Sequence, residues 1–239
     1  MVQKTTIFLI NGLGSDKQSR QLYGLFFLVI LLLGTTVAVA QTTLTQSFRF
    51  NSGVYLSFEA FQNNVPSYGA NDIEGNYFIN KQTKQAKVEY IRLKATQEKL
   101  NLNKMWCIVI KGIPYVKTTP NLPSHSLKVF AAMEVRGNIC YFAYDDIEEK
   151  EMIFKAYNPL IGKPFRTGKV KRKVPVIKEK MLRFRTGEVA LFNYSNVLQW
   201  LADDAEIVTA LKSLGPEKAE SKLFDALLLY NDKYLVSLN

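Results

Sequence analysis

The chain of 239 residues carries 31 Lys and Arg against 21 Asp and Glu, a formal net charge of +10, and 47% of its residues are hydrophobic. This length and apolar content are sufficient for a genuine hydrophobic core. Two Cys and one His without close spacing exclude a zinc site. The positive charge favours anionic partners such as phospholipid head groups, lipopolysaccharide or acidic glycans.

An uncharged apolar run over residues 21–40 dominates the N-terminal part and ends in Ala38-Val39-Ala40. Its apolar density falls after Leu33 into small residues, which is typical of a signal peptide before its cleavage site. We therefore predict that residues 1–40 are a signal peptide and that the protein is exported, either periplasmic or secreted. The run is also long enough to cross the roughly 30 Å hydrocarbon core as an uncleaved inner-membrane signal anchor. Because we expect export, nucleic acid is not an expected partner.

The exported part is predicted to be a short leader, 41–52, followed by a single α+β domain, 53–239, which is β-rich over 77–192 and helical over 196–232. Near its start, Ser57 can cap a short helix with Glu59 in the first turn, and Asn63-Asn64 with Pro66 ends it.

Runs rich in β-branched and aromatic residues, bounded by turn residues, predict the strands. They fall at 76–79, 87–93, 105–111, 113–117, 127–135 and 138–144, with two more short strands around Thr186-Gly187. No long helix separates them, so parallel crossover units are excluded. The spacing indicates an antiparallel β meander or a small, partly open barrel.

A change of composition follows the last of the central strands. Residues 145–151 are predicted to form an acidic turn. The C-terminal part is helical, with helices predicted at 197–202, at 204–214 before Gly215, and from Pro216 to about Tyr230.

Cys107 and Cys140 lie in two apolar runs that we predict to be neighbouring strands facing one core. Two buried free thiols are one interpretation. A disulfide is the other, since the compartment is oxidising, provided that the two Cα atoms come within about 7 Å.

The sequence holds no catalytic constellation, and we predict no enzymatic activity, no cofactor and no metal. His125 lies in a polar loop, where a solvated histidine is the usual case. The acids of 145–151 lack the alternating ligand register of a calcium loop, so a solvated charged segment is favoured.

The basic segment 163–185 holds ten Lys and Arg against Glu179 alone. Its candidate anion-binding residues are Lys169, Lys171, Arg172, Lys173, Lys178 and Lys180. One interpretation is protection of an exposed sheet edge, for which lysines are a common device. The other is adhesion to anionic lipid or glycan through cations presented along one face.

Four segments in order, GVYLSFEAFQNNVPS, NKMWCIVIKGIPYV, GNICYFAY and LRFRTGEVALFNYSNVLQWLADDAEIVTAL, resemble an uncharacterised family of secreted and periplasmic proteins from Gram-negative bacteria. The resemblance implies export and supplies no activity. Arg185 stands where members of that family commonly have an acidic residue before Thr-Gly, so no role of that carboxylate carries over.

Three functions follow as hypotheses. The main one is a non-enzymatic binding or structural module of the cell envelope, whose partner could be another envelope protein. The alternative is electrostatic adhesion to anionic lipid or glycan through 163–185. The least favoured is an enzyme with an unrecognised carboxylate pair.

Overall fold

The computed structural model describes residues 42–120, 127–157 and 159–238. All of them belong to one compact unit, Gln41–Asn239. The uncharged run at 21–40 and His125 lie outside the described residues.

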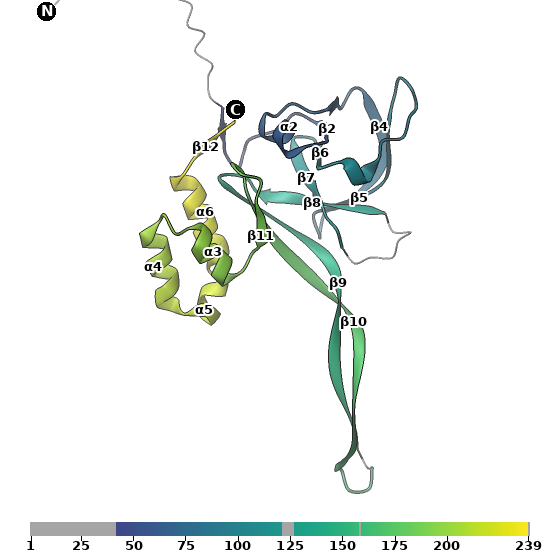
Figure 1. The fold of residues 1–239 in the computed structure, drawn as a ribbon, viewed down its shortest axis with the longest axis vertical. Helices are drawn as coiled ribbons and strands as arrows, with labels where there is room; N and C mark the ends of the chain where they lie inside the picture. Colours follow the sequence, from purple (N-terminus) through teal and green to yellow (C-terminus); the bar gives the residue numbers. More distant parts are fainter. Residues whose placement is uncertain (1–41, 121–126, 158, 239) are drawn as a thin grey trace, which may run out of the picture. The chain divides into compact units, whose positions relative to one another are not determined.

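Strands dominate this unit, as Figure 1 shows. They are β1 (Thr43–Leu44), β2 (Gly53–Tyr55), β3 (Tyr68–Gly69), β4 (Ile73–Asn80), β5 (Gln85–Leu93), β6 (Cys107–Ile110), β7 (Ile113–Lys117), β8 (Lys128–Val135), β9 (Ile139–Tyr157), β10 (Pro164–Arg183), β11 (Val189–Leu191) and β12 (Val236–Ser237). The helices are α2 (Phe58–Gln62), the short 3₁₀ helix η1 (Leu102–Lys104), α3 (Tyr194–Trp200), α4 (Ala205–Leu214), α5 (Pro216–Glu220) and α6 (Leu223–Lys233).

Most of the strands form one open, curled antiparallel sheet in the order β11-β10-β9-β8-β7-β6-β2-β3. The sheet branches at β8. One edge of β8 pairs with β7, while its other edge pairs first with β5, at Lys128 to Ala131, and then with β9, at Met133 to Val135. The predicted α+β class with an antiparallel sheet and C-terminal helices is therefore confirmed.

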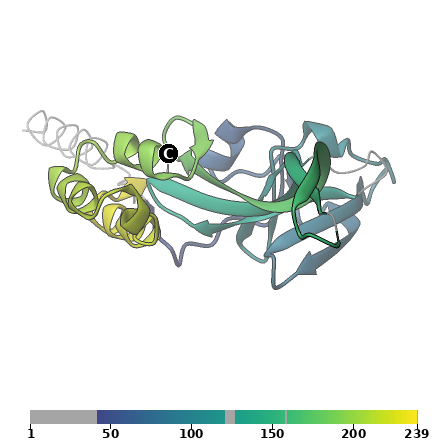
Figure 2. The ribbon, with the colours of Figure 1, turned by 90° about the horizontal axis from the view of Figure 1, so that it is seen from below.

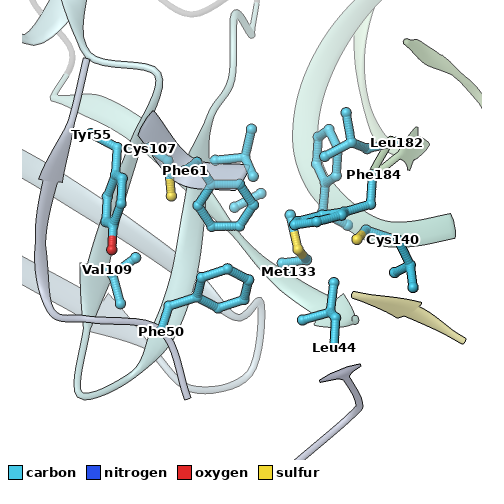
Figure 3. Packing of buried hydrophobic residues seen from close by; sticks show 14 of the residues in the cluster. Leu44, Phe50, Tyr55, Phe61, Cys107, Val109, Met133, Cys140, Leu182 and Phe184 are labelled. Atoms are coloured by element: carbon cyan, nitrogen blue, oxygen red, sulfur yellow. The ribbon is translucent and has the colours of Figure 1, made fainter. Parts of the chain in front are cut away.

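Successive side chains of a strand point to opposite faces of a sheet. In the packed part of this sheet both faces carry apolar side chains, and other elements cover each face. On one face Val109, Val116 and Phe142 pack with Phe61 of α2, and aromatic rings line this core. The Phe61 ring stacks on Phe50 at 4.3 Å between centroids (Figure 3). The alternate residues point to the other face, where they enter two further clusters.

The second face is covered in two parts (Figure 2). The β4–β5 hairpin covers Ile108, Tyr115 and Phe130. Helices α3 to α6 cover Tyr141 and Met181 at the start of β9 and the end of β10. Asn231 fastens α6 to β9, because its amide donates to the carbonyl of Ile139 and accepts from its N–H, at 2.8 and 2.9 Å.

Several local predictions are confirmed. Ser57 caps α2 by accepting from the N–H of Ala60. The helix predicted at 204–214 is α4, and its cap, which was not predicted, is Asp204, whose side chain accepts from the N–H of Ile207. In the Thr186-Gly187 turn, Gly187 has φ +76°, and a Cβ there would lie 2.6 Å from the Phe58 ring, so only glycine fits.

Other predictions are corrected. The predicted helix from Pro216 is two helices, α5 and α6, which are separated at Ser221-Lys222. The residues predicted to be a leader belong to the folded unit: β1 pairs with β12, and Leu44 and Phe50 are buried. The predicted acidic turn at 145–151 is part of β9, which runs on to Tyr157. Paired with the basic β10, this acidic stretch is stable as a strand.

Candidate anion-binding ribbon

Strands β9 and β10 continue beyond the rest of the sheet as a two-stranded ribbon (Figure 1). Their register runs from Ile139 opposite Arg183 to Tyr157 opposite Pro164. The third strand on the β9 side, β8, pairs only as far as Phe142. We call residues 147–157 and 159–175 the ribbon; all its described side chains are exposed or half-buried.

The ribbon concentrates positive charge. It holds three acidic residues, Glu148, Glu149 and Glu151. Against them stand eight basic residues: Lys150, Lys155, Lys163, Arg166, Lys169, Lys171, Arg172 and Lys173. More than half of the unit's formal net positive charge thus lies on a narrow, solvent-exposed element that an anionic partner can reach.

One face of the ribbon is apolar and cationic. The register places Met152 opposite Val170 and Phe154 opposite Gly168, and the basic residues of this face are Lys150, Arg166 and Arg172. The Arg172 guanidinium lies 5.2 Å from the centre of the Phe154 ring, a cation–π contact. This contact holds the arginine along the apolar stripe.

The same face sets two like charges against each other. Lys150 lies directly opposite Arg172, and a like-charged pair in directly opposed positions destabilises an antiparallel ladder. A bound anion between the two side chains would remove this repulsion. An anionic ligand would therefore bind favourably beside this pair.

The opposite face carries glutamates opposite lysines, with a surplus of lysine. Glu151 lies opposite Lys171 and Glu149 opposite Lys173. Lys169 Nζ lies 2.6 Å from Glu151 Oε1. Exposed pairs of this kind contribute little to stability, and their carboxylates can release the lysines to a ligand at small cost.

The six basic residues predicted to bind anions do not form one surface. Lys169, Lys171, Arg172 and Lys173 lie on the ribbon, but Arg172 points to the opposite face from the three lysines. Lys178 and Lys180 lie at its base, where β9 and β10 rejoin the sheet.

At the base of the ribbon, Lys178 forms ion pairs within the protein. Its Nζ lies 3.2 Å from a carboxylate oxygen of Asp146 and 3.2 Å from one of Glu148. Hydrogen bonds to Asp146 and then Glu148 raise the pKa of Lys178 above its ordinary value. Lys180 is half-buried between Phe142 of β9 and Leu191 of β11. Neither lysine belongs to the exposed charged surface.

The six predicted anion-binding residues did not include Lys150, Lys155 or Arg166, although Arg166 lies in the predicted basic segment 163–185. The apolar residues Met152 and Phe154 were not predicted to belong to this surface. A signal for them was present. The turn residues Pro159, Gly162 and Pro164 stand between two β-type runs of similar length, which is typical of a long hairpin. The many acidic residues of 145–151 indicated a turn there instead, so the long hairpin was not predicted.

The two cysteines are buried free thiols in this structure. Their strands are not neighbours as predicted, because β7 and β8 lie between β6 and β9. Both enter the same hydrophobic cluster, with Cys107 on the side of Tyr55 and Cys140 on the side of Phe184 (Figure 3). Burial raises the pKa of Cys140 to about 12 and that of Cys107 well above its usual range, so both thiols stay protonated and unreactive.

The other described parts of the unit offer less chemistry. A cavity of about 500 Å³ between α4 and α6 is lined by Ile207, Leu211, Leu214 and Leu229, and its charged rim is paired internally, as between Lys233 and Glu206 at 2.8 Å. Within the described residues, no three His, Cys, Asp or Glu side chains gather closely enough to hold a metal ion.

Comparisons with protein-family models, with curated proteins and with solved structures find no match for this chain. In the described part of the chain, no helix has the length and apolar character needed to cross a membrane.

Proposed function

We propose that the protein is an exported, non-enzymatic binding module of the cell envelope, and that its ribbon adheres to an anionic surface by charge. The observation that carries the proposal is the exposed excess of eight basic over three acidic residues on a two-stranded element. A ribbon of this kind adds nothing to the hydrophobic core, and two-stranded hairpins are at best marginally stable alone.

The positive charge of the ribbon is large enough to hold the protein reversibly at an anionic surface. Each Lys or Arg held near an anionic membrane surface contributes on the order of 1 kcal/mol. Several acting together give reversible attachment. Salt screens such attraction over about 8 Å at physiological ionic strength, so adhesion should weaken steeply as salt is added.

Protection of a sheet edge explains less of the ribbon. Edge lysines prevent one strand from pairing with another chain. That role does not require Lys150 opposite Arg172, nor a cationic face that also exposes Met152 and Phe154.

Retention of residues 41–239 on an immobilised polyanion, heparin, tests the proposal. The triple variant Lys171→Gln, Arg172→Gln and Lys173→Gln should elute at clearly lower salt than the wild type. A matched control removes the same charge from exposed positions elsewhere: Lys104→Gln, Lys212→Gln and Lys218→Gln.

The control triple variant should elute close to the wild type. Equal shifts of the two triple variants would contradict the proposal, because net charge alone would then govern retention. Circular dichroism and Tm of both variants verify that the fold is intact.

A further inference from the structure

The end of the ribbon, residues 157 and 159–162, gathers exposed apolar side chains, and we call these residues the tip. Leu160 is 91% exposed, Ile161 64% and Tyr157 56%. Gly162, with φ +64°, gives the chain the left-handed conformation that reverses its direction here. Apolar side chains grouped at a turn cannot be buried by the protein's own core, so their placement calls for an external apolar environment.

Basic residues encircle the tip without acidic ones. Lys163 follows the turn, and Lys155 and Arg166 stand on the two strands just behind it. The nearest acidic residue along either strand is Glu151, which is already paired with Lys169. Apolar side chains therefore lie at the end of the ribbon, and Tyr157 and the basic residues lie behind them.

We propose that the tip inserts into the interface of an anionic lipid bilayer, with Leu160 and Ile161 among the acyl chains and the basic residues at the phosphate level. This inference rests on the proposed function and names its ligand class. Tyr157 fits the same geometry, because tyrosine prefers the boundary between hydrocarbon and head groups.

Charge complementarity and apolar exposure together favour a membrane over a glycan. An acidic glycan satisfies the lysines but offers Leu160 and Ile161 no apolar interior. Stable peripheral attachment commonly needs two signals, a small inserted apolar group and a polybasic patch. The tip and the ribbon behind it supply both within one hairpin.

The length of the ribbon separates the inserted end from the rest of the unit. An extended strand rises about 3.3 Å per residue, so Ile147 to Tyr157 reaches roughly 30 Å. This distance exceeds the screening length of about 8 Å at physiological ionic strength. The charges of the tip therefore act on a membrane independently of the packed part of the unit.

A fluorophore on the tip reports insertion directly. In the variant Leu160→Cys of residues 41–239, a thiol-reactive, environment-sensitive dye labels the new cysteine, because Cys107 and Cys140 are buried. A matched variant, Glu217→Cys on α5, carries the dye on an exposed site away from the ribbon. Neutral vesicles contain phosphatidylcholine alone. Anionic vesicles also contain phosphatidylglycerol, at roughly one anionic head group in three, which makes their surface potential negative.

The dye at residue 160 should shift to the blue and gain intensity with the anionic vesicles and change little with the neutral ones. The dye at residue 217 should not respond to either. No response at residue 160 while the protein cosediments with anionic vesicles would overturn the inference, since attachment would then be electrostatic only.

The tip variant Leu160→Ser with Ile161→Ser separates this failure from that of the proposed function. Its affinity for anionic vesicles should fall by about tenfold or more. Its retention on heparin should equal that of the wild type. Unchanged vesicle affinity would overturn tip insertion and leave the proposed function standing. Loss of heparin retention by the Lys171, Arg172 and Lys173 variant addresses the proposed function alone.

Discussion

Strands β9 and β10 have two regions of opposite character. In the inner region, residues 139–144 and 178–183 are mostly buried between two hydrophobic clusters and are flanked by β8 and β11. In the ribbon the same two strands have no neighbouring strand among the described residues, and Ile153, Phe154 and Val170 are exposed. One pair of strands is therefore held by core packing at one end and by cross-strand pairs alone at the other.

The comparison separates residues that maintain the fold from residues available to a partner. Apolar side chains in the inner region stabilise the unit by burial, at roughly 25 cal/mol per Å². Apolar side chains on the ribbon make no comparable contribution to the folded state. Their exposure is explained if they contact a partner, and this explanation makes the two regions respond differently to the same substitution.

The largest contrast is expected for phenylalanine. Phe61 is fully buried, with Phe50 at 4.3 Å and Trp106 at 4.8 Å between ring centroids. Phe61→Ala should lower the free energy of unfolding by about 3–5 kcal/mol through lost burial and a cavity. Phe154→Ala on the ribbon should cost less than about 1 kcal/mol, mainly the contact with Arg172. Chemical denaturation of both variants checks the difference, and similar losses would contradict it.

A smaller effect is expected where α6 joins β9. Asn231→Ala leaves the buried N–H and carbonyl of Ile139 without the hydrogen bonds that the side chain supplies. An unsatisfied buried polar group costs about 1–3 kcal/mol. The variant should show a lower Tm, whereas Asp232→Ala at the exposed neighbouring position should not. A Tm equal to that of the wild type would show that α6 is held by apolar packing alone.

Acid should destabilise the helical side of the unit, where Asp204 caps α4. The Asp204 carboxylate accepts from the N–H of Ile207 and from Lys233 Nζ, and these bonds, in that order, hold the pKa of Asp204 below its ordinary value of 3.8. The folded-state pKa is lowered. Its contribution to stability is therefore present above the unfolded value and is lost as the pH falls through the folded one.

Thermal unfolding measured from pH 6 down to about pH 2, the range that spans ordinary carboxyl pKa values, checks this prediction. The wild type should lose Tm below the ordinary pKa of aspartate. Asp204→Asn should start lower and show a flatter acid limb. An acid limb of equal slope in both proteins would assign the loss to other carboxylates.

Local features of the fold could be predicted from the sequence because their causes are local. Ser57, Asp204 and Gly187 act through neighbouring backbone groups, so a cap or a turn is readable from a few residues. Strand β7 was predicted with its observed bounds, Ile113–Lys117, since Gly112 and a β-branched run mark it.

The ribbon could be predicted only in part, because its stability depends on pairing between distant segments. Residues 145–151 have the composition of a turn. They form a strand because β10 supplies cations: lysines lie opposite Glu149 and Glu151, and Lys178 contacts Asp146 and Glu148. Which cations share a face depends on register, and one residue of slippage would exchange the faces. The sequence therefore indicated the basic segment but could not place Arg172 beside Phe154.

Removal of the ribbon tests the central claim most directly. A variant that joins Asp146 to Val176 through an Asn-Gly turn, a pair suited to a tight hairpin, deletes 147–175 and keeps Lys178 beside Asp146. Because the deleted residues add nothing to the core, its Tm should stay within about 2–4 °C of the wild-type value, the shift expected for 1 kcal/mol. Its retention on heparin and its binding to anionic vesicles should both be lost. A folded deletion variant that still binds anionic vesicles like the wild type would contradict the account.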